Sequence, residues 1–502
     1  MSSASPATQF QPSVDSPPRR DQRPRRNTKI VCTLGPASAS EAGIRGLLGC
    51  GADVLRLNFS HADHAWHEDV LRRIRQIAGE LRIPVAVMQD LCGPKIRLSR
   101  LATDPLTVEV GDRVHITTDE ILDRAQADGV PFHFDMASTY NPLLEDVEPG
   151  HRILFDDGRI EMIVEDKLQQ AIVASVLRGG TVTSRKGMNL PGAELSTEAM
   201  TDKDWHDLKW GIRNQVDFVA LSFVRRPEDV SKVRDRLREA GSHAALIAKI
   251  ERPEAVDRIL AICELADGLM VARGDLGLET DLAQVPLLQK HLIEQCRAAG
   301  KPVITATQVL ESMVVQSTPT RAEVSDVANA VYDGTDAIML SAETATGKFP
   351  ESSVTVIDRV ARVTESDLAS QRFQERADGR LATPAAAVVE GAVAAALSLR
   401  VTRVVVYSQS GLTARLIARC RLPMPVVAVT NSINTYRQLN LCYGVVPLWL
   451  PEISNLHELL CEMDRLVVSQ QWGGPSDMIV VVSALDGRDG NIDTLHIHRI
   501  AD

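Results

Sequence analysis

Two carboxylates and a lysine follow short apolar runs of the chain, where they could bind a divalent metal. Glu251 and Asp275 each end such a run, and Lys249 lies two residues before Glu251. Carboxylate oxygens suit Mg²⁺ or Mn²⁺, with phosphates and water completing the shell. Residues two apart in a strand point to the same side, so the lysine would face the same space as the metal. An ammonium group beside a divalent ion suits phosphoryl transfer.

Further polar residues follow other apolar runs. They are Arg56, Asn58, Ser60, Asp90, Arg97 and Thr307. Each signal alone is ordinary, since a Lys-x-Glu pair is usually a surface ion pair and an RGD segment can occur by chance. Five runs that end in such residues favour one shared site for an anionic substrate. The sequence contains no complete P-loop and no G-x-G-x-x-G motif at a helix start, so a phosphate would be held by side chains and metal.

The apolar runs themselves predict the elements that carry these residues. Eight of them, from KIVCTLGP to AIMLSAE, are rich in leucine and β-branched residues, and helical stretches follow. Near-continuous apolar runs are typical of strands buried on both faces of a parallel sheet. Eight βα units close naturally into a (β/α)₈ TIM barrel, whose functional side chains gather at the carboxyl ends of the strands.

The chain divides into three domains and a tail. The barrel is expected to comprise residues 28–97 and 196–357, because the third and fourth apolar runs are far apart. Residues 98–195, inserted between them, show turn dipeptides and alternating apolar residues, which predict a small β-barrel. Residues 358–502 predict a separate three-layer α/β domain. Residues 1–27 are rich in Ser, Pro, Gln and Arg and are expected to be disordered.

Composition argues against several classes of function. The chain has 502 residues and a net charge of −11, which opposes attachment to nucleic acid or to an anionic membrane. Aromatic residues make up only 4% of it, too few for base-stacking platforms. No apolar run reaches the roughly 20 residues that a membrane-spanning helix needs. The eight cysteines form no C-x-x-C pair, which predicts free thiols and a cytoplasmic location.

Nine motifs along the chain resemble those of one enzyme family, pyruvate kinase. In order they read TKIVCTLGPAS, LRLNFSH, DLCGPKIR, RKGMNLPG, IAKIE, ARGDLG, ATQVLESM, PTRAEVSDVANAV and MLSAET. The resemblance runs from Thr28 to the end. It implies a barrel, a mobile lid inserted after the third strand, a C-terminal regulatory domain and a homotetramer. It also implies phosphoryl transfer from phosphoenolpyruvate to ADP, which gives pyruvate and ATP in the last step of glycolysis, with Mg²⁺ or Mn²⁺ as cofactor.

The resemblance assigns catalytic and metal-binding roles to matching residues. Arg56 would contact the phosphate of phosphoenolpyruvate, and Lys249 would stabilise the transferring phosphoryl group. Glu251 and Asp275 would bind the divalent metal. In this assignment the protein supplies mainly positioning and positive charge.

The resemblance also assigns the remaining substrate contacts. Gly274, Asp275 and Thr307 would hold the carboxylate end of phosphoenolpyruvate. Thr307 would lie, through water, on the route of the proton that converts enolpyruvate to pyruvate. Asp157 of the inserted domain would approach the site when the lid closes. The residues expected near the nucleotide are Asn58, Ser60, His61, Arg97 and Lys186.

One departure from the family concerns a monovalent cation. Many members hold K⁺ with residues that match, in this chain, Asn58, Ser60, Asp90 and the carbonyl of Leu91. They carry glutamate where this chain has Lys95. The K⁺-independent branch has lysine there, and its ammonium can replace the ion, so the resemblance implies activity without K⁺. The alternative is a surface lysine beside an intact K⁺ site.

A loop in the C-terminal domain is a candidate for a second phosphate. SQSGLTAR lies between a predicted strand and helix, where hydroxyls and free N–H groups suit an anion. Family members bind sugar phosphates at the matching loop, which implies a phosphorylated allosteric effector at Ser408, Ser410, Gly411 and Thr413. The alternative is an ordinary helix start capped by Ser410. Leu412 replaces a basic residue of some members, so the identity of the effector stays open.

Two other functions fit part of the pattern. A metal-dependent lyase or aldolase of pyruvate-type substrates also uses a barrel with Glu and Asp on the metal, but it would not need the inserted domain. A non-catalytic metabolite sensor could keep the fold, but the presence of Lys249, Glu251, Asp275 and Thr307 argues against it.

Overall fold

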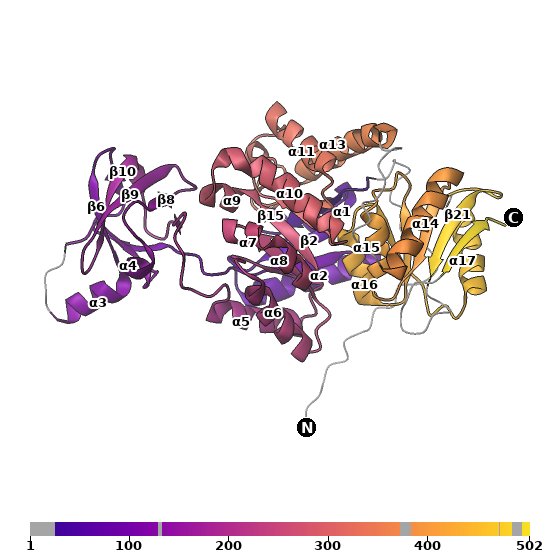
Figure 1. Cartoon of the computed structure of the whole chain (residues 1–502), viewed down its shortest axis with the longest axis horizontal. Helices are drawn as coiled ribbons and strands as arrows, with labels where there is room; N and C mark the ends of the chain where they lie inside the picture. The colour runs from indigo at the N-terminus through magenta and orange to yellow at the C-terminus, as the bar shows by residue number, and fades with distance from the viewer. Residues whose placement is uncertain (1–25, 129–132, 372–382, 471, 484–493, 502) are drawn as a thin grey trace, which may run out of the picture.

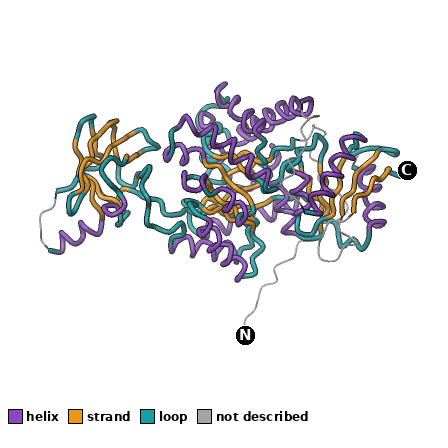
Figure 2. Tube along the Cα trace, in the orientation of Figure 1, coloured by secondary structure: helices purple, strands orange, loops and turns teal. Residues whose placement is uncertain are grey.

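The chain forms three bodies in a row along its longest axis (Figure 1). The computed structural model describes residues 26–128, 133–371, 383–470, 472–483 and 494–501. An inserted domain lies at one end, a barrel with its helices in the middle and a C-terminal domain at the other end. Figure 2 shows the strands of the middle body in its interior and the helices outside them.

In the described part of the chain, eight parallel strands close into a barrel in the order β1-β17-β16-β15-β14-β13-β3-β2. This confirms the predicted (β/α)₈ fold, because each of the eight apolar runs contributes one strand. The strands are β1 (Lys29–Thr33), β2 (Val54–Asn58), β3 (Ala86–Asp90), β13 (Phe218–Leu221), β14 (Ala245–Ile250), β15 (Gly268–Ala272), β16 (Val303–Ala306) and β17 (Ala337–Leu340).

Helices follow the strands and cover the barrel. They are α1 (Glu41–Cys50), α2 (His64–Leu81), α5 (Asp202–Arg213), α6 (Pro227–Glu239), α7 (Pro253–Asp257), α8 (Ile259–Leu265), α9 (Arg273–Glu279), η1 (Leu282–Gln284), α10 (Val285–Ala298), η2 (Glu311–Val314), α11 (Arg321–Asp333), α12 (Ala342–Ala345) and α13 (Pro350–Gln371).

The barrel strands are buried on both faces, as their apolar composition predicts. Side chains such as Val31, Met88 and Ile247 fill the interior. Their neighbours along the strands, such as Ile30 and Leu246, pack against the surrounding helices. Full burial of one such side chain stabilises the fold by about 1.5–3 kcal/mol. Because both faces are filled, polar side chains reach solvent mainly at the strand ends.

The inserted domain follows β3 and has its own apolar core. Among its described residues, one sheet has the order β12-β8-β9-β10-β6-β7-β4, and β11 pairs separately with β5. The elements are β4 (Leu98–Leu101), β5 (Leu106–Val108), β6 (Arg113–Thr118), α3 (Asp119–Ala127), β7 (Met136–Ser138), α4 (Leu143–Asp146), β8 (Arg152–Phe155), β9 (Ile160–Lys167), β10 (Ile172–Arg178), β11 (Gly180–Val182) and β12 (Met188–Asn189).

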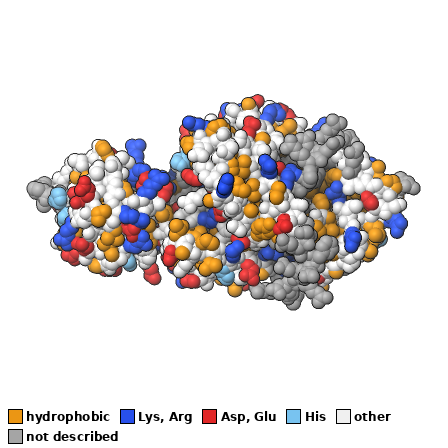
Figure 3. Space-filling view, turned by 90° about the horizontal axis from the view of Figure 1, so that it is seen from above, with side chains coloured by type: hydrophobic (Ala, Val, Ile, Leu, Met, Phe, Trp, Pro, Cys, Tyr) orange, Lys and Arg blue, Asp and Glu red, His pale blue; other side chains and the backbone are white. Residues whose placement is uncertain are grey.

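The two ends of the inserted domain are joined to each other. Leu98 N donates to Lys186 O at 2.8 Å, and Met188 N donates to Ile96 O at 3.0 Å. These bonds connect the two outer strands of the large sheet, β4 and β12, and make the sheet barrel-like, as predicted. Figure 3 shows a narrow waist between this domain and the barrel.

The C-terminal domain has three layers. Within its described residues, the sheet order is β20-β19-β18-β21-β22, and only the β21–β22 pair is antiparallel. Helices α14 and α15 pack on one face and α17 on the other. The elements are α14 (Pro384–Leu399), β18 (Arg403–Tyr407), α15 (Leu412–Ala418), β19 (Val426–Thr430), α16 (Ile433–Gln438), η4 (Leu439–Leu441), β20 (Val445–Trp449), α17 (Leu456–Ser469), β21 (Met478–Ser483) and β22 (Thr494–Arg499).

Two expected domain limits differ from the structure. Residues 1–25 of the expected tail lie outside the described residues, but Arg26 is buried and lies 2.9 Å from Asp53 and 3.1 Å from Asp358. Composition could not reveal these ion pairs, since both partners are distant in sequence. The limit expected at residue 357 falls inside α13, whose later residues Ala361 and Leu368 still belong to the barrel core. No helix among the described residues is long and apolar enough to cross a membrane.

Candidate active site

The carboxyl ends of β3, β13 and β14 bring four polar side chains into contact. Lys249 donates to the Ser222 hydroxyl at 2.7 Å and to Asp90 Oδ1 at 3.2 Å. Its Nζ also lies 2.9 Å from Glu251 Oε1. The Lys249 side chain is 12% exposed and both carboxylates are almost fully buried. Lys249 and Glu251 therefore form part of a buried cluster, not a surface ion pair.

Arg56 reaches this cluster from β2. Its Nε donates to Asp90 Oδ2 at 2.7 Å, and its Nη1 donates to Thr33 Oγ1 at 2.9 Å. Burial alone raises the pKa of Asp90, but the positive charges of Arg56 and Lys249 outweigh it and hold the pKa below its usual value. Asp90 is therefore ionised at neutral pH and holds both cations at the barrel mouth.

Glu251 and Asp275 form an acidic pair beside Lys249. Burial raises the pKa of Glu251, the charge of Lys249 opposes this, and the negative charge of Asp275 adds to the rise. The Glu251 Oε2 atom accepts a hydrogen bond from Phe223 N at 2.9 Å. Two carboxylates that repel each other are a donor set that a divalent cation stabilises. Two protein ligands also leave room for the phosphate and water ligands that Mg²⁺ keeps, so these residues fit the predicted metal.

The pKa of Lys249 favours its charged form. Burial lowers this pKa, but the negative charges of Asp90 and Glu251 outweigh burial and raise it above the usual value. A lysine with a raised pKa is a fixed positive charge and a poor proton acceptor at neutral pH. The cluster therefore suits charge stabilisation rather than proton abstraction by Lys249.

The ends of β15 and β16 place Gly274 beside Thr307. Gly274 N donates to Thr307 Oγ1 at 2.7 Å. Thr307 and Gln308 have φ angles of 64° and 52°, a left-handed conformation that is uncommon for a β-branched residue. Arg273 Nη2 holds this turn by donating to the carbonyls of Thr307 at 2.9 Å and Gln308 at 3.0 Å. Such strained turns are concentrated at functional sites.

The residues predicted near the nucleotide begin where β2 ends. Ser60 N donates to Asn58 Oδ1 at 3.1 Å. Burial lowers the pKa of His61, and the positive charges of Lys95, Arg97 and Arg56 lower it further. His61 is therefore surrounded by cations, and this positive potential suits a polyphosphate.

Arg97 and Lys186 lie on the paired segments that connect the inserted domain to the barrel. Arg97 forms an isolated antiparallel bridge with Gly187, and its Nη1 donates to Arg185 O at 3.0 Å. Lys186 forms an ion pair with Asp156 in the turn between β8 and β9. These two cations thus depend on the position of the inserted domain, unlike those on the barrel strands.

Asp157 lies in the same turn, which contacts the barrel mouth. A Cβ added at Gly158 would lie 3.1 Å from Leu278 of α9, the helix that also carries Asp275. Burial raises the pKa of Glu311 in η2, and the negative charges of Glu343 and Asp157 raise it further. The turn therefore faces α9 and η2 in this structure.

The residues of the predicted cation pocket meet at the ends of β2 and β3. Asn58 pairs with Asp90 in the strand register, and Leu91 O accepts a hydrogen bond from Ser222 Oγ at 2.7 Å. Lys95 is exposed at the start of the segment that leads into the inserted domain. Its Cε would lie 3.7 Å from a Cβ added at Gly187. Lys95 therefore borders both the strand ends and the inserted domain.

The candidate effector loop lies far from this cluster, at the start of α15. Gly411 N donates to Ser408 Oγ at 3.0 Å and Leu412 N donates to Ser410 Oγ at 3.4 Å. These bonds are short-range, but the alternative of a helix capped by Ser410 does not hold, because α15 begins after Gly411, which has a φ of 76° and makes no side-chain cap bond. Arg415 Nη1 donates to Ser410 O at 3.2 Å and supplies a cation that Leu412 lacks. Thr413, the fourth predicted residue, is buried.

Three residues that contact the site were not predicted from the sequence. Thr33 binds Arg56, Ser222 binds Lys249, and Arg273 holds the Thr307 turn. Thr33 and Ser222 follow the apolar runs KIVC and DFVAL, so their position at strand ends was a usable signal. Arg273 stands in the RGD segment directly before Gly274.

Comparison with known proteins agrees with this geometry. Residues 25–354 match the family "Pyruvate kinase, barrel domain", and residues 386–498 match "Pyruvate kinase, alpha/beta domain". The chain belongs to the pyruvate kinase family. It is 42% identical to a pyruvate kinase of Sporosarcina psychrophila, over 95% of this chain and 81% of that protein. It is 41% identical to a pyruvate kinase of Agrobacterium vitis, over 95% and 98% of the two chains.

A solved structure extends the comparison to three dimensions. The crystal structure of a pyruvate kinase from Cryptosporidium parvum matches with a TM-score of 0.87 and 34% sequence identity, over 95% of this chain and 96% of that one. The likeness therefore includes the barrel, the inserted domain and the C-terminal domain. This pyruvate kinase family member is accordingly a phosphotransferase with the family fold.

Proposed function

We propose that this pyruvate kinase transfers the phosphoryl group of phosphoenolpyruvate to ADP, giving pyruvate and ATP. The observation that carries the proposal is the buried cluster of Lys249, Arg56, Asp90 and Glu251 at the barrel mouth, in a chain of this family. Four charged side chains of fixed position at the barrel mouth suit a reaction in which charge stabilisation is the main task.

The barrel residues act on the transferring group. Lys249 and Arg56 place positive charge where the phosphoryl oxygens gather negative charge, and Asp90 keeps both side chains in position. A divalent metal held by Glu251 and Asp275 would supply further positive charge there. Gly274 and Thr307 hold the carboxylate end of the substrate, and Thr307 lies on the proton route to the enol, through water.

The inserted domain contributes further contacts to the nucleotide. Arg97 and Lys186 bind the phosphates of ADP together with Asn58, Ser60 and His61. Because the Asp157 turn already faces α9, closure of this lid would bring Asp157 to the site and exclude water. Exclusion of water strengthens every charge interaction in the site.

The direct test of the function is pyruvate formation by the full chain from phosphoenolpyruvate, ADP and Mg²⁺, followed by coupled reduction of the pyruvate. We expect turnover that requires all three components. Pyruvate released without ADP would instead support a lyase or phosphatase, and binding of phosphoenolpyruvate without turnover would support a metabolite sensor.

We further propose that the enzyme needs no K⁺, with Lys95 in place of the ion. Wild-type kcat is expected to change less than about twofold when KCl replaces tetramethylammonium chloride, since the pocket already holds a cation. Lys95→Glu is expected to be about tenfold or more slower without K⁺ and to recover when K⁺ is added. Initial rates at constant ionic strength measure this.

The matched control for Lys95→Glu is Lys209→Glu, which makes the same charge change at an exposed position on α5. It should leave the response to K⁺ unchanged. A many-fold rise of the wild-type rate with K⁺ would show that Lys95 is an ordinary surface lysine beside an intact K⁺ site.

An allosteric effector with a phosphate group is proposed for the loop from Ser408 to Thr413. Ser410→Asp places a negative charge beside the loop amides and is expected to abolish the response of the rate to sugar phosphates or AMP, because the like charges repel. The measurement is the phosphoenolpyruvate saturation curve with and without each compound. An unchanged response in this variant would assign the loop a purely structural role. A homotetramer remains a prediction from the resemblance, and a cytoplasmic location remains a prediction from the cysteine pattern.

A further inference from the structure

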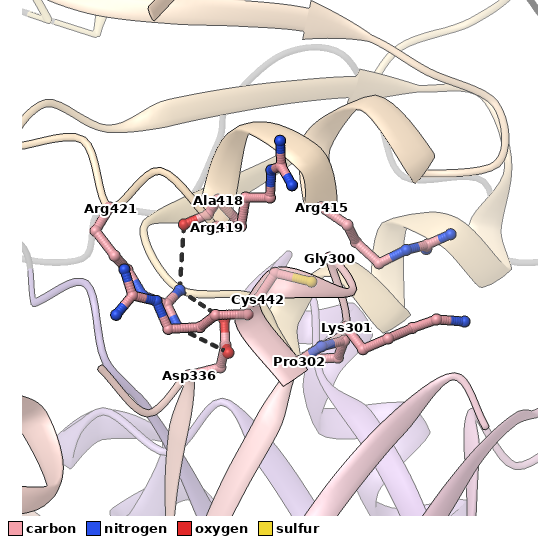
Figure 4. Close-up of a pocket in the computed structure, with 10 residues that line it drawn as sticks. Gly300, Lys301, Pro302, Asp336, Arg415, Ala418, Arg419, Arg421 and Cys442 are labelled. Atoms are coloured by element: carbon pink, nitrogen blue, oxygen red, sulfur yellow. Dashed lines mark hydrogen bonds and ion pairs between the residues drawn. The ribbon is translucent and has the colours of Figure 1, made fainter. Parts of the chain in front are cut away.

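A cavity lies where the amino ends of the barrel strands meet the C-terminal domain (Figure 4). About 220 Å³ of space lies within it, part of which is open to solvent. The walls come from the end of α10, from the segment that enters β16 and from α15 with the residues after it. The charged residues that line it are Arg297, Lys301, Asp336, Arg415, Arg419 and Arg421.

The single carboxylate among these lining residues is already saturated. Arg421 Nη1 and Nη2 lie 2.9 Å from Asp336 Oδ1 and Oδ2. Tyr443 N and Val303 N donate to the same carboxylate at 3.0 and 3.1 Å. Asp336 therefore neutralises Arg421 and not the other cations of the cavity.

Arg419 is the most informative of the remaining cations. Its side chain is only 6% exposed, yet its nearest carboxylate oxygen, on Glu390, is 4.0 Å away and belongs to a side chain that is 43% exposed. Its Nη1 donates to Ala298 O at 3.5 Å, and its Nε and Nη2 have no hydrogen-bond partner among the described residues. Burying a guanidinium with unmade hydrogen bonds is costly. An anion in the cavity would remove that cost.

Lys301 and Arg415 add to the positive potential. Figure 4 shows their side chains extending in the same direction from opposite walls. Lys301 Nζ donates to Ala266 O at 2.8 Å. Burial lowers the pKa of Lys301; the charge of Asp267 opposes this, whereas the charges of Arg234 and Arg415 lower the pKa further. Asp267 is itself bound by Arg234 at 2.8 Å. Lys301 and Arg415 therefore repel each other across the cavity.

We propose that this cavity binds a phosphate group, either inorganic phosphate or the phosphate of a small metabolite, between Arg419, Lys301 and Arg415. A dianion satisfies several guanidinium and ammonium donors at once. The residues Ser408–Thr413 do not line the cavity, although Arg415, which does, also donates to Ser410 O at 3.2 Å.

The proposed site would join the barrel to the regulatory domain. Lys301 leads into β16, whose other end carries the Thr307 turn, and Arg419 follows α15, whose start is the Ser408–Thr413 loop. A phosphate held by both would fix the position of α15 on the barrel. This inference does not depend on the proposed reaction, since its test measures binding.

The test is a titration of the full-length enzyme with inorganic phosphate at constant ionic strength, without divalent metal or substrate, by calorimetry and by melting temperature. Wild type is expected to bind phosphate and to melt at a higher temperature with it than with chloride. Arg419→Gln and Lys301→Gln should each weaken this binding about tenfold or more and lose most of the shift. The active site can also bind phosphate. The proposed site is therefore identified by the difference in phosphate affinity and melting shift between wild type and the variants.

Arg400→Gln removes the same charge from an exposed position in the C-terminal domain and should behave like wild type. Lys301, which is only half-buried, provides a second variant if Arg419→Gln does not fold. Equal phosphate binding and equal melting shifts in wild type and both variants would overturn the proposal, as would no phosphate binding to wild type. Competition by glycerol 3-phosphate would identify a metabolite phosphate, and its failure to compete would identify inorganic phosphate.

Discussion

Replacing Lys249 with methionine is expected to lower kcat for pyruvate formation by about 10³-fold, the cost of losing one charge-stabilising donor in a preorganised site. Lys249 is held by Ser222 and two carboxylates, so its ammonium has one fixed position. Methionine keeps roughly the length and the apolar stem of the side chain but removes the charge and the hydrogen bonds to Ser222 and Asp90. The measurement is the steady-state rate with saturating phosphoenolpyruvate, ADP and Mg²⁺.

The matched control is Lys209→Met, on the exposed face of α5, which should keep the wild-type rate. Circular dichroism and melting temperature show whether Lys249→Met is folded, since removing the lysine leaves two buried carboxylates without their partner. Full turnover by folded Lys249→Met would refute the role proposed for this lysine.

The second large effect is expected from Glu251→Gln. Removing one of two carboxylate ligands should lower the rate about 10²-fold or more at physiological Mg²⁺ and raise the Mg²⁺ concentration needed for half of the maximal rate. Glutamine can still accept the hydrogen bond from Phe223 N, which in wild type is 2.9 Å from Glu251 Oε2. Initial rates measured against Mg²⁺ concentration give the kinetic effect.

Mn²⁺ binding, followed by electron paramagnetic resonance, separates metal affinity from turnover. It should weaken in Glu251→Gln and stay unchanged in Glu264→Gln, which alters an exposed carboxylate of α8. Equal Mn²⁺ affinity in wild type and Glu251→Gln would exclude Glu251 as a ligand, whatever the rate.

The barrel was predictable because its physical signal is local. Strands buried on both faces need near-continuous apolar runs, and runs such as DFVAL and GLMVA are visible in the sequence alone. The long interval before Phe218 then located the inserted domain. The two-residue spacing of Lys249 and Glu251 correctly placed them on one side of a strand end, in contact with each other.

The remaining features depend on contacts between distant residues. Ser222 binds Lys249 only because β13 and β14 are neighbours in the sheet. Arg26 is buried by Asp53 and Asp358, which lie far along the chain. An isolated serine or arginine carries no periodic pattern, so such residues become visible only when the strands are placed in register.

The paired ends of the inserted domain bear on how such a protein could have arisen. Ile96 and Met188 are hydrogen-bonded across two adjacent antiparallel segments, so the chain leaves and rejoins the barrel at points about 5 Å apart. A short turn can close a gap of that size. An ancestral barrel could therefore have gained this domain in one genetic insertion, without any change in the order of its strands.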